Sequence, residues 1–231
     1  MLDPAKCDPA LLLLPDAVVT GLLRQTSSLR AQDIMIVGAH CRDILRSASG
    51  QDSGLRTTED VDFGLALADW AAYDELTRGL EPAGNTGIRY QIADVPTDLM
   101  PFGDLENPSG TVTPARREPI SVWGFSEIFH ASRPLPLPNA GTIRIPTIAG
   151  YAALKLVAWL DRSAWGTYKD ASDIAASTRL SELAARWPGP RADSLYAEMN
   201  VTNTFLWPRA PEDRQRRVQA MERGLGINSA T

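Results

Sequence analysis

The chain has 231 residues, a length that fits one large domain or two small ones. Its 44% hydrophobic and 22% charged residues are typical of a globular protein with a sizeable core, and its only two cysteines, Cys7 and Cys41, argue against a disulfide framework or a zinc cluster. The formal net charge of −5 is unevenly divided, with 8 basic and 17 acidic residues in 1–115 and 15 basic and 11 acidic residues in 116–231.

The first predicted element is a helix over residues 9–30, in which Leu13, Ala17 and Leu22 recur near helical spacing. Its leucine run, residues 11–14, is far too short to span a bilayer, and it lacks the basic start and the cleavage site of a signal peptide. We therefore expect a cytoplasmic protein that has no membrane partner.

A short buried strand over residues 33–37 is expected next, and Gly38 and Ala39 turn it into a second helix. Two small residues at a strand–helix junction let backbone N–H groups approach a phosphate closely, and a helix N-terminus adds positive potential there. The turn is neither a P-loop nor a dinucleotide fingerprint, because Gly38 lacks the further glycines that both motifs require.

Asp60 and Asp62 open the next predicted strand, which runs through Leu67. Side chains on a strand alternate between its two faces, so both aspartates should share one face while Val61 points into the core. Two carboxylates held that close are tolerated best with a divalent cation between them. The alternative interpretation is that they are solvated charges at a strand end, as most such pairs are.

A helix capped by Asp69 and two strands follow, over residues 70–80, 89–93 and 97–102, with residues 94–96 as the turn between the strands. Asp98 on the second of these strands adds a third carboxylate, and is the candidate catalytic base or ligand of a second metal ion. Three carboxylates suit Mg2+, which prefers oxygen ligands and bridges them to substrate phosphates.

The second half begins with a predicted mobile loop over residues 103–119 and short strands over 120–146. From Thr147 onward the apolar spacing is helical. The expected fold is therefore α/β (α+β): a catalytic domain over residues 1–146, with a small mixed sheet flanked by helices, and a helical domain over residues 147–231.

Only three lysines occur in the chain, and two of them, Lys155 and Lys169, fall in the helical half. Lys155 stands on an otherwise apolar helix face, where it either meets phosphates or extends its ammonium group from a core position to water. Lys169 and Asp170 are equally compatible with ordinary charges in a first helical turn. Residues 209–223 hold five arginines, which either bind RNA or form a solvated helix end.

Residues 37–45 (Val-Gly-Ala-His-Cys-Arg-Asp-Ile-Leu) and 58–63 (Thr-Glu-Asp-Val-Asp-Phe) resemble the opening of the polymerase-beta-type nucleotidyltransferase superfamily. The first segment is also similar to the Gly-Gly-x-x-Arg-Asp opening of tRNA CCA-adding enzymes. Residues 151–159 and 169–174 are similar to the Lys-containing helix and the Lys-Asp-x-x-Asp helix of AbiEii-type nucleotidyltransferases. These are toxins of toxin–antitoxin pairs linked to phage abortive infection. The resemblance runs from about residue 33 to residue 185.

The resemblance implies transfer of a nucleoside monophosphate from an NTP to an acceptor hydroxyl, with Mg2+, two ions by expectation, as cofactor. It also implies RNA, such as a tRNA 3′ end, as the acceptor and a cognate antitoxin as a protein partner. Ala39 departs from the Gly or Ser that is common at the family's second small position. The roles implied are metal binding by Asp60, Asp62 and Asp98, nucleotide binding by Gly38, Ala39, Arg42, Lys155 and Lys169, and completion of the catalytic set by Lys155 and Asp170.

Two alternatives remain open from the sequence. One is a nucleotidyltransferase that modifies a small molecule, which needs the same site but no basic surface. The other is a protein that keeps the fold without catalysis and binds a nucleotide or an antitoxin. A hydrolase triad is not expected, because nothing places His40 or His130 beside a Ser or Cys nucleophile.

Overall fold

The computed structural model describes residues 6–50, 60–114 and 118–162. The chain divides into two units, Met1–Tyr151 and Ala152–Thr231, and the last described helix, α5 (Ile148–Arg162), passes from the first into the second. The described part is an α/β fold with a mixed sheet, which confirms the predicted fold class. Lys169, Asp170 and the arginines of residues 209–223 lie outside the described residues.

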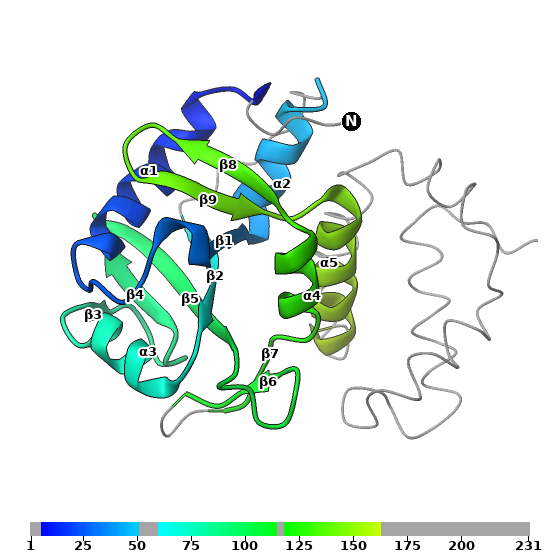
Figure 1. The fold of residues 1–231 in the computed structure, drawn as a ribbon. Coiled ribbons are helices and arrows are strands. Elements are labelled where there is room, and N and C mark those ends of the chain that lie inside the picture. Colours follow the sequence, from blue (N-terminus) through cyan, green and yellow to red (C-terminus); the bar gives the residue numbers. More distant parts are fainter. Residues whose placement is uncertain (1–5, 51–59, 115–117, 163–231) are drawn as a thin grey trace, which may run out of the picture. The chain divides into compact units, whose positions relative to one another are not determined.

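The first unit is built on a seven-stranded sheet with the order β3-β4-β5-β2-β1-β9-β8 (Figure 1). In that order the strands are Glu81–Pro82, Arg89–Ile92, Val95–Gly103, Val61–Leu67, Ile34–Val37, Gly141–Ile145 and Arg133–Leu137. The pairs β2–β5 and β1–β9 are parallel, and the other neighbours are antiparallel. A separate two-stranded sheet joins β6 (Thr111–Val112) to β7 (Ile120–Ser121).

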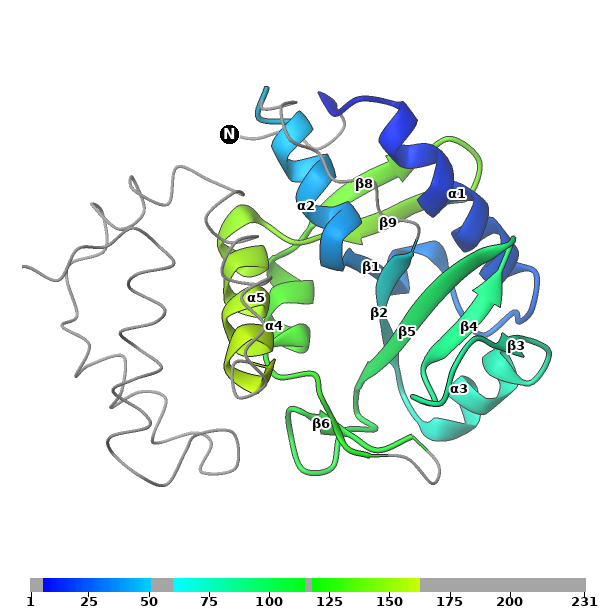
Figure 2. The same ribbon diagram turned by 180° about the vertical axis from the view of Figure 1, so that it is seen from behind.

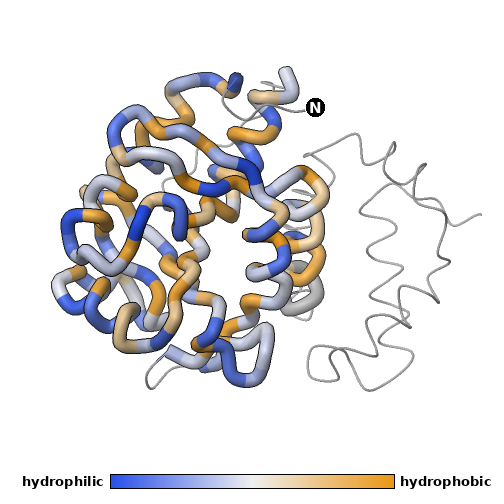
Figure 3. The backbone as a smooth tube through the Cα atoms, in the orientation of Figure 1, coloured by the Kyte–Doolittle hydropathy of each residue, from blue (hydrophilic) through white to orange (hydrophobic). Residues whose placement is uncertain are grey.

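Helices cover both faces of the sheet (Figures 1 and 2). On one face, α1 (Ala10–Leu23) packs so closely that a Cβ atom at Gly21 would lie 3.0 Å from Ile92 Cγ2 of β4. On the other face, Phe102 of β5 packs against α4 (Phe125–Ala131). α2 (Gly38–Ser47) contacts α1, and α3 (Trp70–Thr77) contacts β2. Hydrophobic residues are spread through these strands and helices rather than gathered in one segment (Figure 3).

Two predicted helices are shorter in the structure than the sequence suggested. The helix predicted over residues 9–30 ends at Leu23. Just beyond it, Thr26 Oγ1 accepts a hydrogen bond from the Ser28 backbone N–H at 3.0 Å and donates one to the Glu75 carboxylate at 2.8 Å. A local bond between a side chain and the backbone competes with continuation of a helix. The predicted cap at Asp69 is confirmed, since its Oδ1 accepts from the Ala72 N–H at 2.9 Å, but α3 ends at Thr77.

The turn predicted at residues 94–96 begins one residue earlier in the structure. Ala93 and Asp94 form the turn, with φ values of 50° and 62°, and Ile92 pairs directly with Val95. Two residues with positive φ match the right-handed twist of an antiparallel hairpin. Pro96 therefore lies within β5, and the turn fixes the register that sets β4 against Asp98.

The loop predicted as mobile over residues 103–119 is organised in its described part. The Glu106 carboxylate accepts backbone N–H bonds from Gly103 at 3.0 Å and from Gly110 at 2.6 Å, and β6 follows at once. Glycine and proline content predicted a loop but carried no sign of this side-chain-to-backbone closure.

The region predicted as short strands over residues 120–146 also contains an unpredicted helix, α4. Seven residues are too few for a clear helical period to emerge from the sequence. Pro134 and Pro136 lie in β8, which forms one edge of the sheet, where a missing N–H group costs no ladder bond.

Candidate functional site

Three predicted carboxylates come together where the parallel strands β2 and β5 begin. Asp62 of β2 pairs in register with Asp98 of β5, and Asp60 immediately precedes β2. Val61 is fully buried, as predicted, so Asp60 and Asp62 lie on the opposite face of the strand from it. This is the sheet face on which Phe102 packs against α4. Register thus joins two aspartates that are far apart in the sequence.

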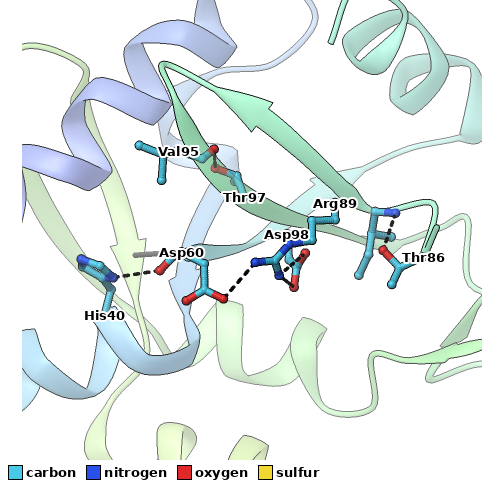
Figure 4. A network of polar contacts seen from close by, with 8 residues as sticks. His40, Asp60, Thr86, Arg89, Val95, Thr97 and Asp98 are labelled. Carbon is cyan, nitrogen blue, oxygen red and sulfur yellow. Dashed lines mark hydrogen bonds and ion pairs between the residues drawn. The ribbon is translucent and has the colours of Figure 1, made fainter. Parts of the chain in front are cut away.

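Arg89 on β4 joins this group, although no sequence motif predicted it. It pairs in register with Asp98, and its Nη1 lies 3.2 and 3.3 Å from the two Asp98 carboxylate oxygens. Its Nη2 donates to Asp60 Oδ2 at 3.2 Å, so one guanidinium bridges two of the three carboxylates (Figure 4). Arg89 lies in the strand that forms a hairpin with the Asp98 strand, which could have indicated the contact. That inference needs the strand register, which the sequence did not give.

The charges of this cluster are only partly balanced. The side chains of Arg89, Asp60 and Asp98 are 30%, 38% and 24% exposed. Burial raises the pKa of Asp98 above its ordinary value, and the Asp60 charge adds to this, although Arg89 and a hydrogen bond with Asp62 pull it down. The pKa of Arg89 is raised by the Asp98 and Asp60 carboxylates, against the opposing effect of its burial. One guanidinium therefore bridges the two carboxylates of Asp60 and Asp98, whose combined negative charge exceeds its own.

Gly38 forms the junction between β1 and α2 and lies against Asp62. Its φ is +66°, and a Cβ atom there would lie 2.7 Å from Asp62 Cγ. Both the backbone conformation and the close approach require glycine. The turn that the sequence predicted as a phosphate contact is thus adjacent to one of the predicted metal ligands.

His40 fixes the backbone just before β2. The ring is buried, and its Nδ1 lies 3.2 Å from the Asp60 carbonyl oxygen (Figure 4). Burial lowers the pKa of His40, although the hydrogen bond with Asp60 opposes the shift. The ring is therefore neutral at pH 7, and Nδ1–H donates to the carbonyl. This bond ties α2 to the residue that leads into the carboxylate strand.

Two further predicted site residues, Arg42 and Lys155, are buried. Arg42, expected at the nucleotide, is 3% exposed, and its Nε donates to Asp43 Oδ1 at 2.7 Å. Its guanidinium is therefore packed within the protein rather than displayed at the surface. Lys155 is a buried residue of α5 in the second unit. The structure thus brings together Gly38, Asp60, Asp62 and Asp98 but gives Arg42 a different environment.

The donor chemistry of the cluster fits Mg2+, because it offers carboxylate oxygens from three side chains. Within the described ranges, however, no three or more His, Cys, Asp or Glu side chains are arranged to hold a metal ion. Arg89 contacts both Asp60 and Asp98, so these carboxylates are arranged around a guanidinium. A divalent cation would have to take over those contacts.

No protein-family model matches the chain, and no curated protein matches it at a significant level. Among the helices of the described segments, none is long and apolar enough to cross a membrane. The resemblance to AbiEii-type nucleotidyltransferases therefore stays a prediction from short motifs, and the function has to be argued from the site itself.

Proposed function

We propose that this protein is a Mg2+-dependent nucleotidyltransferase that moves a nucleoside monophosphate from an NTP to an acceptor hydroxyl and releases pyrophosphate. One observation carries the proposal: Asp62 and Asp98 stand opposite each other on adjacent parallel strands, with Asp60 beside them and the Gly38 backbone against Asp62. The reaction requires phosphate binding next to metal-binding carboxylates, and the glycine turn at Gly38 lies beside the carboxylate of Asp62.

Each of these residues has a role in the proposed reaction. Asp60, Asp62 and Asp98 would hold Mg2+, whose chemistry when bound is to neutralise charge on the triphosphate and acceptor oxygens. The backbone at Gly38 and Ala39 would bind the triphosphate. Asp98, which pairs in register with Asp62, is also the carboxylate that would accept the proton of the acceptor hydroxyl. Lys155 would pair with phosphate oxygens, as the motif resemblance implies.

RNA, such as a tRNA 3′ end, is the acceptor that we propose, and a role as the toxin of a toxin–antitoxin pair goes with it. The 15 basic residues against 11 acidic ones in 116–231 support a polyanionic acceptor. A small-molecule acceptor would use the same carboxylates but would need no such basic surface.

The test is pyrophosphate release and label transfer from each of the four NTPs, with Mg2+ and total RNA, by the intact chain and by Asp62→Asn. The matched control is Asp94→Asn, which removes the same charge from the exposed turn of the neighbouring hairpin, at a positive φ that Asn tolerates. We expect transfer by the wild type and the control, and a loss of about 100-fold or more in Asp62→Asn.

Three results would contradict parts of the proposal. Full transfer by Asp62→Asn would show that the carboxylate cluster is not the site. Pyrophosphate release that is unchanged by RNA, with no labelled RNA at low salt, would replace RNA by a small acceptor. The absence of any Mg2+-dependent release with all four NTPs would leave a protein that binds without catalysis.

A further inference from the structure

Arg89 holds the position from which a cation could reach two of the three clustered carboxylates. It donates to Asp60 and Asp98 from different nitrogens of one guanidinium, and no sequence motif drew attention to it. A divalent cation bound by the same two carboxylates would meet the positive charge of Arg89 at short range, and like charges in such a site repel strongly. Arg89 and a metal ion therefore compete for the same ligands.

The ion pairs of Arg89 with Asp60 and Asp98 are weak enough for another cation to displace the guanidinium. Its three hydrogen bonds measure 3.2–3.3 Å, longer than the roughly 2.7–2.9 Å of strong charge-assisted bonds, and its side chain is 30% exposed. The Arg42–Asp43 pair in the same unit offers an internal comparison, with a 2.7 Å contact and side chains only 4% and 6% exposed. Displacing Arg89 from its partners therefore costs less than displacing Arg42, because water already reaches it.

We propose that Arg89 is an exchangeable counter-ion: the divalent cation takes its place on Asp60 and Asp98, and the released guanidinium binds the triphosphate. A planar guanidinium forms paired hydrogen bonds with phosphate oxygens as readily as with a carboxylate. Metal and triphosphate then bind cooperatively. The triphosphate draws the positive charge of Arg89 away from the cation, and the cation neutralises the carboxylates that would otherwise repel the triphosphate. This inference rests on the proposed function and makes Arg89 a substrate-binding residue within it.

Binding of Mn2+ to the full chain, measured by titration calorimetry at low salt, tests the exchange. The variants are Arg89→Gln and, as the matched control, Arg78→Gln, which removes the same charge from an exposed position at the end of α3. Arg89→Gln should bind free Mn2+ at least about tenfold more tightly than the wild type, since the competing charge is gone. It should bind Mn2+–tripolyphosphate about tenfold more weakly, since the phosphate partner is gone. Arg78→Gln should show neither change.

Opposite changes in the affinity of Arg89→Gln for free Mn2+ and for Mn2+–tripolyphosphate distinguish counter-ion exchange from a purely structural role of Arg89. If Arg89 only orients Asp60 and Asp98, its removal should weaken or leave unchanged the binding of free Mn2+, and that result overturns the inference. Unchanged binding of Mn2+–tripolyphosphate by Arg89→Gln overturns it as well. Arg89→Lys keeps the positive charge but lacks the paired N–H donors of a guanidinium, and it should bind free Mn2+ like the wild type.

A second measurement covers the case in which Arg89→Gln folds poorly. Mn2+ should raise the Tm of this variant more than that of the wild type, because the cation replaces the missing counter-ion. An equal or smaller shift overturns the inference. If the wild type and Arg89→Gln bind Mn2+ equally, only the role of Arg89 fails; if neither binds Mn2+, the proposed function fails with it.

Discussion

Two carboxylate sites in the first unit show what surroundings do to the same kind of side chain. Asp16 on α1 is 5% exposed and accepts three hydrogen bonds, from the Asn139 backbone N–H and side-chain amide and from the Ala140 N–H, at 2.7–2.8 Å. Burial by itself would raise its pKa, but the hydrogen bonds from Asn139 and Ala140 outweigh burial, and the pKa of Asp16 is lowered. The pKa of Asp98 is raised, and burial is the largest cause.

The difference lies in what faces the charge. Asp16 meets neutral donors, which favour the ionised form and tie the turn between β8 and β9 to α1. At Asp98, burial and the Asp60 charge raise the pKa by more than Arg89 and a hydrogen bond with Asp62 lower it. A carboxylate whose charge is met by hydrogen-bond donors serves stability, whereas the partly exposed carboxylates of Asp60 and Asp98 are those that we propose for cation binding. The two sites should therefore respond oppositely to mutation.

The largest expected effect is on transfer at the carboxylates proposed for cation binding. Replacing Asp60 or Asp62 by Ala should lower pyrophosphate release by about 1,000-fold, because one carboxylate fewer leaves the metal–triphosphate unit badly held. Stability should be unchanged or slightly higher, since repulsion between like charges is relieved. Thermal unfolding of the same preparations checks this. Near-full transfer by both variants would mean that the Asp60 and Asp62 carboxylates, like Asp16, have no role in transfer.

Asp16→Ala should behave in the opposite way. It removes the acceptor of three hydrogen bonds to a charged group, so the free energy of unfolding should fall by about 3 kcal/mol. Transfer per folded molecule should stay at the wild-type level. Urea unfolding measures the loss, with Asp74→Ala as the control at an exposed position of α3. Equal stabilities of the two variants would mean that Asp16 does not hold the β8–β9 turn.

A matched pair of glycines tests the contact between the β1–α2 junction and Asp62. Gly38 and Gly50 have φ values of +66° and +72°, but a Cβ atom at Gly50 meets nothing within 4 Å. Gly50→Ala should lose about 1 kcal/mol of stability through backbone strain alone and keep its transfer rate. Gly38→Ala should lose more stability and most of its transfer, because the new methyl group displaces the Asp62 carboxylate. Identical behaviour of the two variants would contradict a role for this contact.

The smallest expected effect is the pH dependence of stability that Asp16 contributes. Its pKa is lower in the folded protein than in the unfolded chain, where an aspartate titrates at about 3.9. The stabilisation is therefore present above about pH 4 and is lost as pH falls through the folded-state pKa. The gap in stability between the wild type and Asp16→Ala should narrow over that acid range. A gap that is constant between neutral and acid pH would show that ionisation of Asp16 contributes nothing.

The sequence alone determined the local parts of this protein. Period-two alternation put Asp60 and Asp62 on the face opposite buried Val61, and the cap at Asp69 and the glycine turn at Gly38 followed from residue type. These features depend on neighbours within a few residues, so pattern and propensity suffice to predict them.

Only the tertiary structure decided how distant segments meet. Parallel pairing of β2 with β5 set Asp98 opposite Asp62, and the two-residue turn at Ala93 and Asp94 set Arg89 opposite Asp98. It also buried Arg42 against Asp43, where the sequence had suggested a nucleotide contact. Strand register and burial depend on the packing of the whole sheet and its helices, because a shift of one residue would turn each side chain to the other face.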